Sequence, residues 1–453
     1  MAPSTAIRLV LVSGALALGC AAAPAHTDAA ATARDAIADA AVDAGPRTGP
    51  KEPAEGADAA YQITARRWLM TGDALMPRDA TFAVSVVAPP AVNTIRAWLD
   101  GVDAGALTRD ASGTFRAAIA APSAPGEHRI LFAADESATA FAARAVTVSA
   151  ALYAVVSVDW DSANPPQANL TWMERLRTAH PRLRYSQFVG PYLFTDPATT
   201  AARKQELVAW ITRQRALGDE LGVHIHPRCS FVNTTSVRCK STPSYAMPDG
   251  DPTGYTVVFA SYTAEEQTAM LRAASELMVQ NGFARPTSFR AGGWTAQLST
   301  LEALERAGYL VESSAFPPET IQASWGAYEL GRWNLRNWTG ITATSQPYHP
   351  SRTHLLSAEP PPTFPVLEVP DNGCLVDYMT GSVMIRVLND NWPDGGALAR
   401  PTVFQVGLHP ESFASGYHAR LNTALTEVDR HLYAADEGPI VYARLTELAP
   451  VWP

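Results

Sequence analysis

The chain has 453 residues, of which 47% are hydrophobic, and it carries a formal net charge of -9 at pH 7. This acidic balance argues against a nucleic-acid-binding surface, so we expect no nucleic-acid partner. The hydrophobic content supports ordinary globular cores, and the roughly 390 residues that follow the N-terminal segments favour two folded domains.

Residues 1–19 have the form of a secretory signal peptide. The stretch "IRLVLVSGALALGC" contains one Arg, an apolar run too short for a confident membrane span, and small residues before Cys20. Cys20 after Gly19 resembles a bacterial lipobox, which implies cleavage before Cys20 and a lipid on its sulfur. We therefore expect an exported protein of the bacterial cell envelope, held to a membrane through a lipid anchor only. The alternative is an ordinary signal peptide followed by an incidental Cys20.

Residues 20–60 are dominated by Ala, Asp, Pro and Thr and hold almost no large apolar side chain. Such a segment cannot bury enough surface to offset the entropy that it would lose on ordering. We predict a lipid-anchored flexible linker, with an Ala-rich helix inside it as the alternative.

Residues 61–150 contain short alternating segments separated by Pro, Gly and Asp turns. The segments include "TFAVSVVA", "TIRAWLDG", "GTFRAAIAA", "EHRILFAAD" and "ARAVTVS". Regular short strands with turn signals predict a small all-β sandwich domain of the Ig-like type. This part shows no cluster of His, Cys or carboxylates, so a spacer or carbohydrate-contact role fits it better than catalysis.

Residues 151–453 alternate between apolar strands and helical patterns. The strand "YAVVSVDWD" precedes the helical pattern "LTWMERLRTAH", and "TVFQVGLHP", "RLNTALTEVDRHLYAA" and "PIVYARL" repeat the alternation near the end. Thr263 and Glu266 form a capping box that predicts a helix through Met278. The alternation indicates an α/β fold with parallel strands, either a barrel or an open sheet.

Polar side chains stand at the ends of four of these predicted strands. They are Asp159 and Asp161 after "VVSV", His224 and His226 after Val223, Arg290 after "TSF", and His409 after "FQVGL". Active sites of parallel α/β folds gather at the carboxyl ends of the strands. We therefore expect these six side chains to converge.

The residue types suit metal-assisted hydrolysis. His224 and His226 are two residues apart on a strand, so they project from one face and can share an ion with one carboxylate. A second carboxylate can remove a proton from water, and a histidine opposite can protonate the leaving group. Each residue taken singly has an alternative: capping or a turn for the Asp pair, a structural ion pair for Arg290, and a core histidine for His409.

The chain contains 4 cysteines, of which three remain if Cys20 is lipidated. In an exported protein, Cys229 and Cys239 are the natural disulfide pair by proximity, with Cys374 left over.

The motifs "SVDWD", "ELGVHIHP", "SFRAGGW" followed by "LEALERAGYLVESS", and "VGLHP" occur in this order. Together, over about residues 154–448, they resemble the polysaccharide deacetylases of the NodB-homology group, carbohydrate esterase family 4. The resemblance implies a distorted (β/α) barrel that hydrolyses N- or O-acetyl groups on a glycan with a bound divalent metal. Matched by motif, it implies Asp159 as general base, Asp161 and His224 as metal ligands, Arg290 as the residue that orients the base, and His409 as general acid.

Two positions depart from the family pattern. Trp160 separates two acids that are adjacent in the family, and Arg228 stands where the family has its second histidine. We assign that ligand to His226 on strand geometry. The ligand types favour Zn, and they also suit Co, Ni, Fe or Mn.

Further substrate contacts are predicted at Trp294, Tyr348, His349 and Asp371, where an aromatic ring or a Pro-flanked loop stands near the motifs. The sequence thus predicts a metal-dependent deacetylase acting on an acetylated polysaccharide or peptidoglycan-like substrate. Two alternatives remain open: a catalytically inactive glycan-binding surface lipoprotein, and a hydrolase of a non-glycan amide.

Overall fold

The computed structural model describes residues 50–453. The predicted signal peptide, the lipidation site Cys20 and the linker as far as residue 49 lie outside the described residues. Among the described residues, no helix is both long and apolar enough to span a membrane.

The last part of the predicted linker differs from the expectation. Backbone hydrogen bonds join Ala54 to Ala138 and Ala140, and Asp58 to Phe141. Because these amide and carbonyl groups are paired with a strand-forming segment, residues 54–58 belong to the folded part and the flexible linker cannot extend to residue 60.

Residues 61–150 form two β-sheets. One has the strand order β1-β3-β7-β6 and the other β2-β9-β8-β4-β5. The strands of the first are β1 (Gln62–Ala65), β3 (Thr81–Val87), β7 (Phe115–Ala120) and β6 (Thr108–Arg109); those of the second are β2 (Trp68–Met70), β9 (Ala142–Ser149), β8 (Gly126–Ala134), β4 (Ile95–Leu99) and β5 (Val102–Ala106).

The two sheets share one hydrophobic core. In β3 the side chains of Phe82, Val84 and Val86 are buried while their neighbours are more exposed, which is the alternation that a half-buried strand requires. They pack with inward residues of the other sheet such as Ile130 and Val146. A separate Ig-like domain that ends at residue 150 stays a prediction.

The remaining strands form a third sheet in which every strand pair is parallel. Its order is β15-β14-β13-β12-β11-β10-β16, and β17 also pairs with β10. The strands are β10 (Leu152–Asp159), β11 (Tyr185–Val189), β12 (Glu220–Ile225), β13 (Ser288–Ala291), β14 (Val311–Glu312), β15 (Leu367–Glu368), β16 (Thr402–Leu408) and β17 (Ile440–Tyr442).

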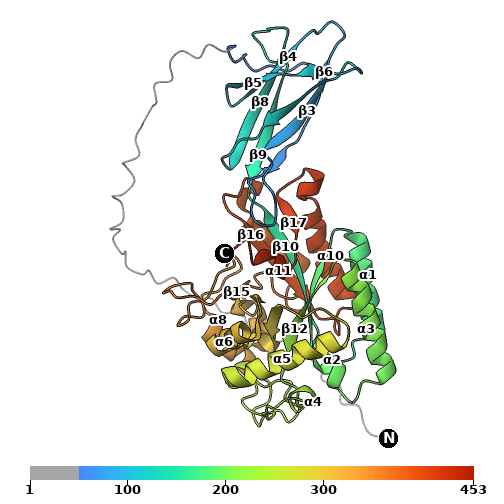
Figure 1. Cartoon of the computed structure of the whole chain (residues 1–453), viewed down its shortest axis with the longest axis vertical. Helices are drawn as coiled ribbons and strands as arrows, with labels where there is room; N and C mark the ends of the chain where they lie inside the picture. Colours follow the sequence, from blue (N-terminus) through green and yellow to red (C-terminus); the bar gives the residue numbers. More distant parts are fainter. Residues whose placement is uncertain (1–49) are drawn as a thin grey trace, which may run out of the picture. The chain divides into compact units, whose positions relative to one another are not determined.

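Helices separate these strands in the chain, as the sequence alternation predicts, and Figure 1 shows the longer ones arranged around the sheet. The α-helices are α1 (Gln167–Ala179), α2 (Tyr192–Thr195), α3 (Ala201–Ala216), α4 (Cys229–Val232), α5 (Ala264–Gln280), α6 (Leu298–Ala307), α7 (Gln322–Trp325), α8 (Glu329–Trp338), α9 (Gly381–Asn391), α10 (Ser415–Asp429) and α11 (Leu445–Leu448). Short 3-10 turns are η1 (Phe259–Ser261), η2 (Gly292–Trp294), η3 (Pro318–Ile321), η4 (Pro393–Gly395) and η5 (Tyr433–Ala435).

The predicted capping box at the start of α5 is confirmed. Thr263 Oγ1 accepts a hydrogen bond from the Glu266 amide at 3.2 Å, and Glu266 Oε2 accepts one from the Thr263 amide at 2.8 Å. Both otherwise unpaired amides at the helix start are therefore satisfied.

The parallel sheet is a half-barrel, whereas the resemblance implied a barrel. Strands β14 and β15 contain two residues each, and no strand pair joins β15 to β16 among the described residues. The irregular segment after β15 spans this gap, because Gly373 N donates to Gln405 O at 2.8 Å and Val376 N donates to Gly407 O at 2.9 Å. The mixed α/β class is confirmed, and strand pairing alone does not close the barrel.

Candidate metal centre and active site

The six polar side chains predicted at strand ends lie at one edge of the parallel sheet. Because β10, β12, β13 and β16 run in the same direction, their carboxyl ends meet there. A cavity of about 130 Å³ opens at this edge, and Asp159, Asp161, His224, His226 and His409 line it. The predicted convergence is confirmed, with Arg290 buried behind the cavity wall.

The rings of His224 and His226 are held in fixed tautomers. His224 Nδ1 lies 3.0 Å from the carbonyl oxygen of Arg290, and His226 Nδ1 lies 2.8 Å from the carbonyl oxygen of Tyr255. Because a carbonyl oxygen can only accept, each Nδ1 must carry the hydrogen. The neutral ring then presents a lone pair at Nε2, the form in which histidine binds a metal ion.

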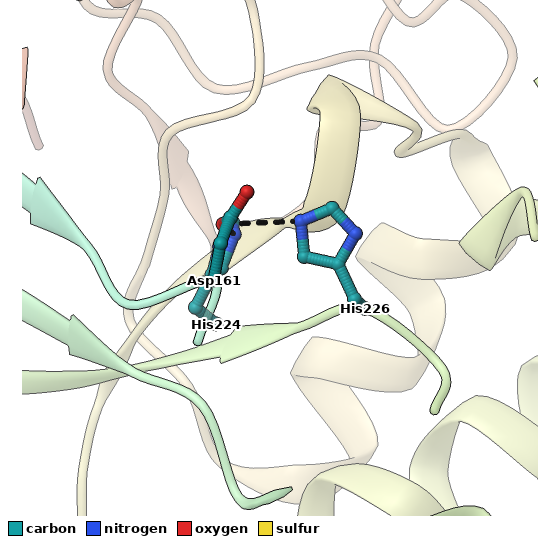
Figure 2. Close-up of side chains that lie close together, drawn as sticks. All are labelled: Asp161, His224 and His226. Atoms are coloured by element: carbon teal, nitrogen blue, oxygen red, sulfur yellow. Dashed lines mark hydrogen bonds and ion pairs between the residues drawn. The ribbon is translucent and has the colours of Figure 1, made fainter. Parts of the chain in front are cut away.

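Both Nε2 atoms face the same oxygen of Asp161. The distances to Asp161 Oδ1 are 2.9 Å from His224 and 3.1 Å from His226. Figure 2 shows the carboxylate of Asp161 turned toward the ring of His226, with the dashed line marking this contact. Three acceptor atoms at such distances repel one another unless a cation, either a metal ion or an added proton, lies among them.

The donor set fits a divalent metal ion. Asp161, His224 and His226 each offer one ligand atom, and these atoms lie within 4.8 Å of one another. Burial lowers the pKa of His226 even though Asp161 opposes that shift, which disfavours the added proton and leaves the ring free to act as a ligand. Two imidazoles and one carboxylate are a common three-ligand set that leaves coordination positions for water and substrate.

Asp161 is held by contacts around the ligand atoms. The Tyr255 hydroxyl donates to Asp161 Oδ2 at 2.7 Å, and the Asp161 amide donates to Glu411 Oε1 at 3.1 Å. Arg228, which stands at the family's second-histidine position, donates from Nη2 to the Asp161 carbonyl at 2.9 Å and covers the Tyr255 ring at 4.3 Å. Arg228 thus helps to position Asp161 through the backbone carbonyl of that residue.

Gly292 explains how His226 can take the ligand role. A Cβ at this position would lie 2.6 Å from the His226 ring, closer than real side chains approach. The glycine of "RAGGW" therefore makes room for the ring over the end of β13.

Asp159 is fixed by the fully buried Arg290. Arg290 Nη1 donates to Asp159 Oδ1 at 3.1 Å and to Oδ2 at 3.2 Å, while its Nε and Nη2 donate to the carbonyl and hydroxyl of Ser313 at 2.7 and 2.9 Å. Burial alone would lower the pKa of Arg290, but Asp159 and Asp371 outweigh it and raise that pKa. The guanidinium therefore stays charged and orients a carboxylate that faces the cavity.

His409 is paired with a carboxylate that sequence reasoning missed. Its Nδ1 lies 3.0 Å from Asp377 Oδ2, and Ser412 donates to the other oxygen of Asp377 at 2.6 Å. Burial alone would lower the pKa of His409, but Asp161 and Asp377 outweigh it and hold that pKa well above its usual value. His409 Nε2 faces the cavity, 3.8 Å from Asp161 Oδ2.

Three predicted substrate contacts lie elsewhere. Tyr348 donates its hydroxyl to the Leu355 carbonyl at 2.9 Å, and neither it nor His349 lines the cavity. Both ring nitrogens of His349 lie within hydrogen-bond distance of backbone carbonyl oxygens, and Nε2 lies 2.9 Å from Trp452 O. Asp371 is fully buried beside Arg290, where burial raises its pKa to about 6. These side chains support the fold around the site and are not exposed to a ligand in the cavity.

Trp294 does line the cavity, but it is almost fully buried. Its ring stacks on Phe316 at 4.2 Å between centroids, and its Nε1 donates to Asp371 Oδ2 at 3.3 Å. Only part of the ring is therefore available to a substrate.

The predicted disulfide between Cys229 and Cys239 is present, and Cys374 is free and buried. The disulfide closes the start of the segment that carries Tyr245 and Tyr255, two cavity residues that the sequence did not predict. This segment follows no strand or helix pattern, so no sequence signal placed its tyrosines at the site.

No family model matches the sequence, and no curated protein matches it. Solved structures are similar to it at low identity. A protein from Parabacteroides distasonis, provisionally named a glycoside hydrolase/deacetylase, is 11% identical over 67% of this chain and 72% of that chain, with a TM-score of 0.43.

Two further structures are similar at comparable levels. A protein from Mycobacterium smegmatis, provisionally named a polysaccharide deacetylase, is 15% identical over 66% of this chain and 89% of that chain, with a TM-score of 0.40. A family 4 carbohydrate esterase from Streptomyces lividans is 8% identical over 66% of this chain and 93% of that chain, with a TM-score of 0.32. Similarity this low carries no functional conclusion.

Proposed function

We propose that this protein is a hydrolase that removes acetyl groups from an N- or O-acetylated glycan, using a divalent metal ion held by Asp161, His224 and His226. The observation that carries the proposal is the set of three convergent acceptor atoms beside Asp159 and His409 in one cavity. The choice of an acetylated polysaccharide or peptidoglycan-like substrate rests on the motif resemblance. The ligand types favour Zn, and Co, Ni, Fe or Mn would also suit them.

The proposed reaction divides the proton transfers between two side chains. When bound, the divalent ion supplies Lewis-acid chemistry that polarises the acetyl carbonyl. Asp159, oriented by Arg290, takes a proton from the attacking water. His409 gives a proton from Nε2 to the departing nitrogen or oxygen while Asp377 holds its Nδ1. The products are acetate and the free amine or alcohol of the sugar.

An inactive glycan-binding protein would not require this arrangement. Placing Arg290 in a fully buried position costs desolvation free energy, which its bonds to Asp159, Ser157 and Ser313 must offset. A binding surface gains nothing from a carboxylate and a histidine that are both fixed beside a metal-ligand set in one cavity. A non-glycan amide could react by the same chemistry, and the choice of substrate in the experiment below separates the two.

The cellular location is proposed from the N-terminal sequence alone. We place the protein at the bacterial cell envelope, exported and anchored by a lipid on Cys20. The variant Cys20→Ala should then leave the membrane fraction, and retention there would contradict the anchor.

The function is tested by separating metal binding from turnover. In Asp159→Asn, bound metal should remain near one ion per chain while acetate release from acetylated oligosaccharides falls at least a hundredfold. His224→Ala and His226→Ala should lose both. Asp390→Asn, which changes an exposed carboxylate on α9, serves as the matched control. Full acetate release by Asp159→Asn would overturn the assigned base, and release from non-glycan amides alone would overturn the glycan substrate.

A further inference from the structure

Five side chains that wall the active-site cavity come from the segments that connect the strands of the parallel sheet. Tyr245 and Tyr255 lie between β12 and α5, Trp325 and Leu330 lie between β14 and β15, and Tyr378 follows β15. All five side chains are large, and together they make the lining predominantly aromatic and apolar around a few polar groups. Such a lining is typical of a pocket that encloses a small ligand.

Hydrogen bonds fasten these wall segments to one another. Leu330 N donates to the Tyr245 carbonyl at 3.0 Å, and Trp325 Nε1 donates to the Tyr378 hydroxyl at 3.3 Å. The other end of α8 is also fixed, because Trp338 Nε1 donates to the carbonyl of Trp294 at 2.8 Å. The wall segments are therefore connected in series and are not a set of independent loops.

The connected walls leave little space and cover the reacting groups. The cavity volume of about 130 Å³ is below the several hundred Å³ usual for pockets that hold drug-sized ligands. Asp159 and the two histidine ligands are each only 2% exposed. An acetyl group is short, so the sugar that carries it must itself enter the cavity for the carbonyl to reach these groups.

An exposed aromatic ring stands next to the wall. Tyr328 is 52% exposed, and its ring meets that of Trp325 edge to face at 5.7 Å between centroids. Its amide donates to the Trp325 carbonyl at 2.8 Å, which fixes the pair at the start of α8. Exposed aromatic rings with an apolar face are suited to stacking on the C–H face of a sugar ring.

We propose that the cavity accepts the acetylated terminal sugar of a glycan chain and excludes sugars in the chain interior, with Trp325 and Tyr328 holding the neighbouring sugar. The proposal rests on the proposed deacetylase function and adds the position on the chain at which it acts. An interior sugar carries a glycosidic bond on both sides, and the connected walls leave no room for the second.

The test uses fully acetylated N-acetylglucosamine oligomers of two to six units, with mass spectrometry to locate the deacetylated unit and 4-nitrophenyl acetate as a small acetyl ester. We expect about one acetate released per chain, from one terminal unit, at every length. Interior units that lose acetate as readily as the terminal one would overturn the proposal while leaving the deacetylase function intact. Hydrolysis of the small ester without any oligomer would overturn it as well. No acetate from either substrate in the metal-loaded protein would instead overturn the proposed function.

Two variants test the walls directly. Tyr328→Ala should raise the KM for the oligomers about three- to tenfold and weaken the quenching of tryptophan fluorescence by the same oligomers. Leu335→Ala, which removes an exposed side chain of α8, is the matched control and should change neither. Trp325→Ala should admit interior units and raise the acetate released per chain above one. An unchanged KM in Tyr328→Ala would remove the aromatic pair from the proposal, and one acetate per chain in Trp325→Ala would contradict the role of the wall.

Discussion

The pairing of His409 with Asp377 leads to a prediction about a single residue. Asp377 accepts from His409 Nδ1 and from Ser412, so it fixes the ring with Nε2 toward the cavity. In Asp377→Asn the amide can present a donor to Nδ1, which reverses the tautomer and removes the proton from Nε2. We expect kcat for acetate release to fall about a hundredfold or more, with metal content unchanged.

Steady-state kinetics and metal analysis on the same preparation check this outcome. Asp429→Asn is a suitable control because Asp429 contacts His180 in a similar way, at 2.7 Å, on α10. Equal losses in the two variants would mean that Asp377 acts through stability alone.

At the residue scale, the sequence located those site residues that end or directly follow a strand. Asp159, His224, Arg290 and His409 could be predicted because parallel strands bring their carboxyl ends together whatever the connecting segments do. Asp377 could not be predicted, because its approach to His409 depends on the irregular segment that spans the gap between β15 and β16.

At the element scale, the disulfide-closed segment between β12 and α5 supports the site. Cys229 and Cys239 are ten residues apart in sequence. Gly254 packs against this disulfide, and its backbone is in the left-handed region at φ +77°. Loop closure of this length contributes roughly 3 kcal/mol by restricting the unfolded chain. The double variant Cys229→Ser, Cys239→Ser should therefore unfold at a lower temperature.

The same variant should bind metal more weakly, because Tyr255 follows Gly254 and donates to Asp161. Thermal unfolding measures the change in stability, and zinc titration measures the change in metal affinity. Cys374→Ser, which replaces a cysteine outside the disulfide, is the control. Unchanged zinc affinity would show that Tyr255 is held in place without the disulfide.

A second element-scale prediction concerns the turn between β4 and β5. His128 Nδ1 lies 2.6 Å from Asp100 Oδ2, and its Nε2 lies 2.9 Å from the Ala124 carbonyl. Both ring nitrogens face acceptors, so the ring must be protonated to satisfy them. Burial alone would lower the pKa of His128, but the bonds to Asp100 and Ala124 outweigh it and raise that pKa.

The sign of the pH dependence follows from these shifts. A raised histidine pKa stabilises the fold below the ordinary pKa of about 6.5, and the contribution is lost as pH rises through the folded value. At the acid end Asp100 must stay ionised, and its own pKa is lowered, because its bonds from Arg129 and His128 outweigh burial. Asp100 is about half exposed, so the pair contributes less than about 1 kcal/mol.

Thermal unfolding of the whole chain and of His128→Gln checks this prediction. The wild type should be the more stable of the two at pH 5.5, and the difference should shrink toward zero at pH 9. A difference that is equal at both pH values would show that His128 acts by packing and not by charge.

At the scale of the whole molecule, the sequence predicted the parallel α/β class but not the extent of the sheet. The class follows from strands that are buried along their whole length, such as β10 and β16, whose sequences are predominantly apolar. The half-barrel could not be predicted, because β14 and β15 are two residues long and leave no periodic signal. The same long excursion between them carries α7 and α8, which supply Trp325 and Leu330 to the cavity wall.

The metal site should also affect the stability of the whole fold. Its ligands come from the loop after β10 and from β12 and its end, so an ion joins segments that separate on unfolding. A ligand that binds only the folded state at a hundred times its Kd adds about 2.7 kcal/mol. We expect zinc to raise the unfolding temperature of the wild type and a chelator to reverse the rise.

The variant Asp161→Asn separates this effect from general ion binding. An amide NH₂ in place of the carboxylate oxygen can donate to the Nε2 lone pairs of His224 and His226, which removes the repulsion among three acceptors. The metal-free variant should therefore be at least as stable as the metal-free wild type, yet gain nothing from zinc. Differential scanning calorimetry of both proteins, with and without zinc, measures the four states. A zinc-induced rise of equal size in Asp161→Asn would show that the ion binds elsewhere, and a marked loss of metal-free stability would show that the three acceptors do not repel one another.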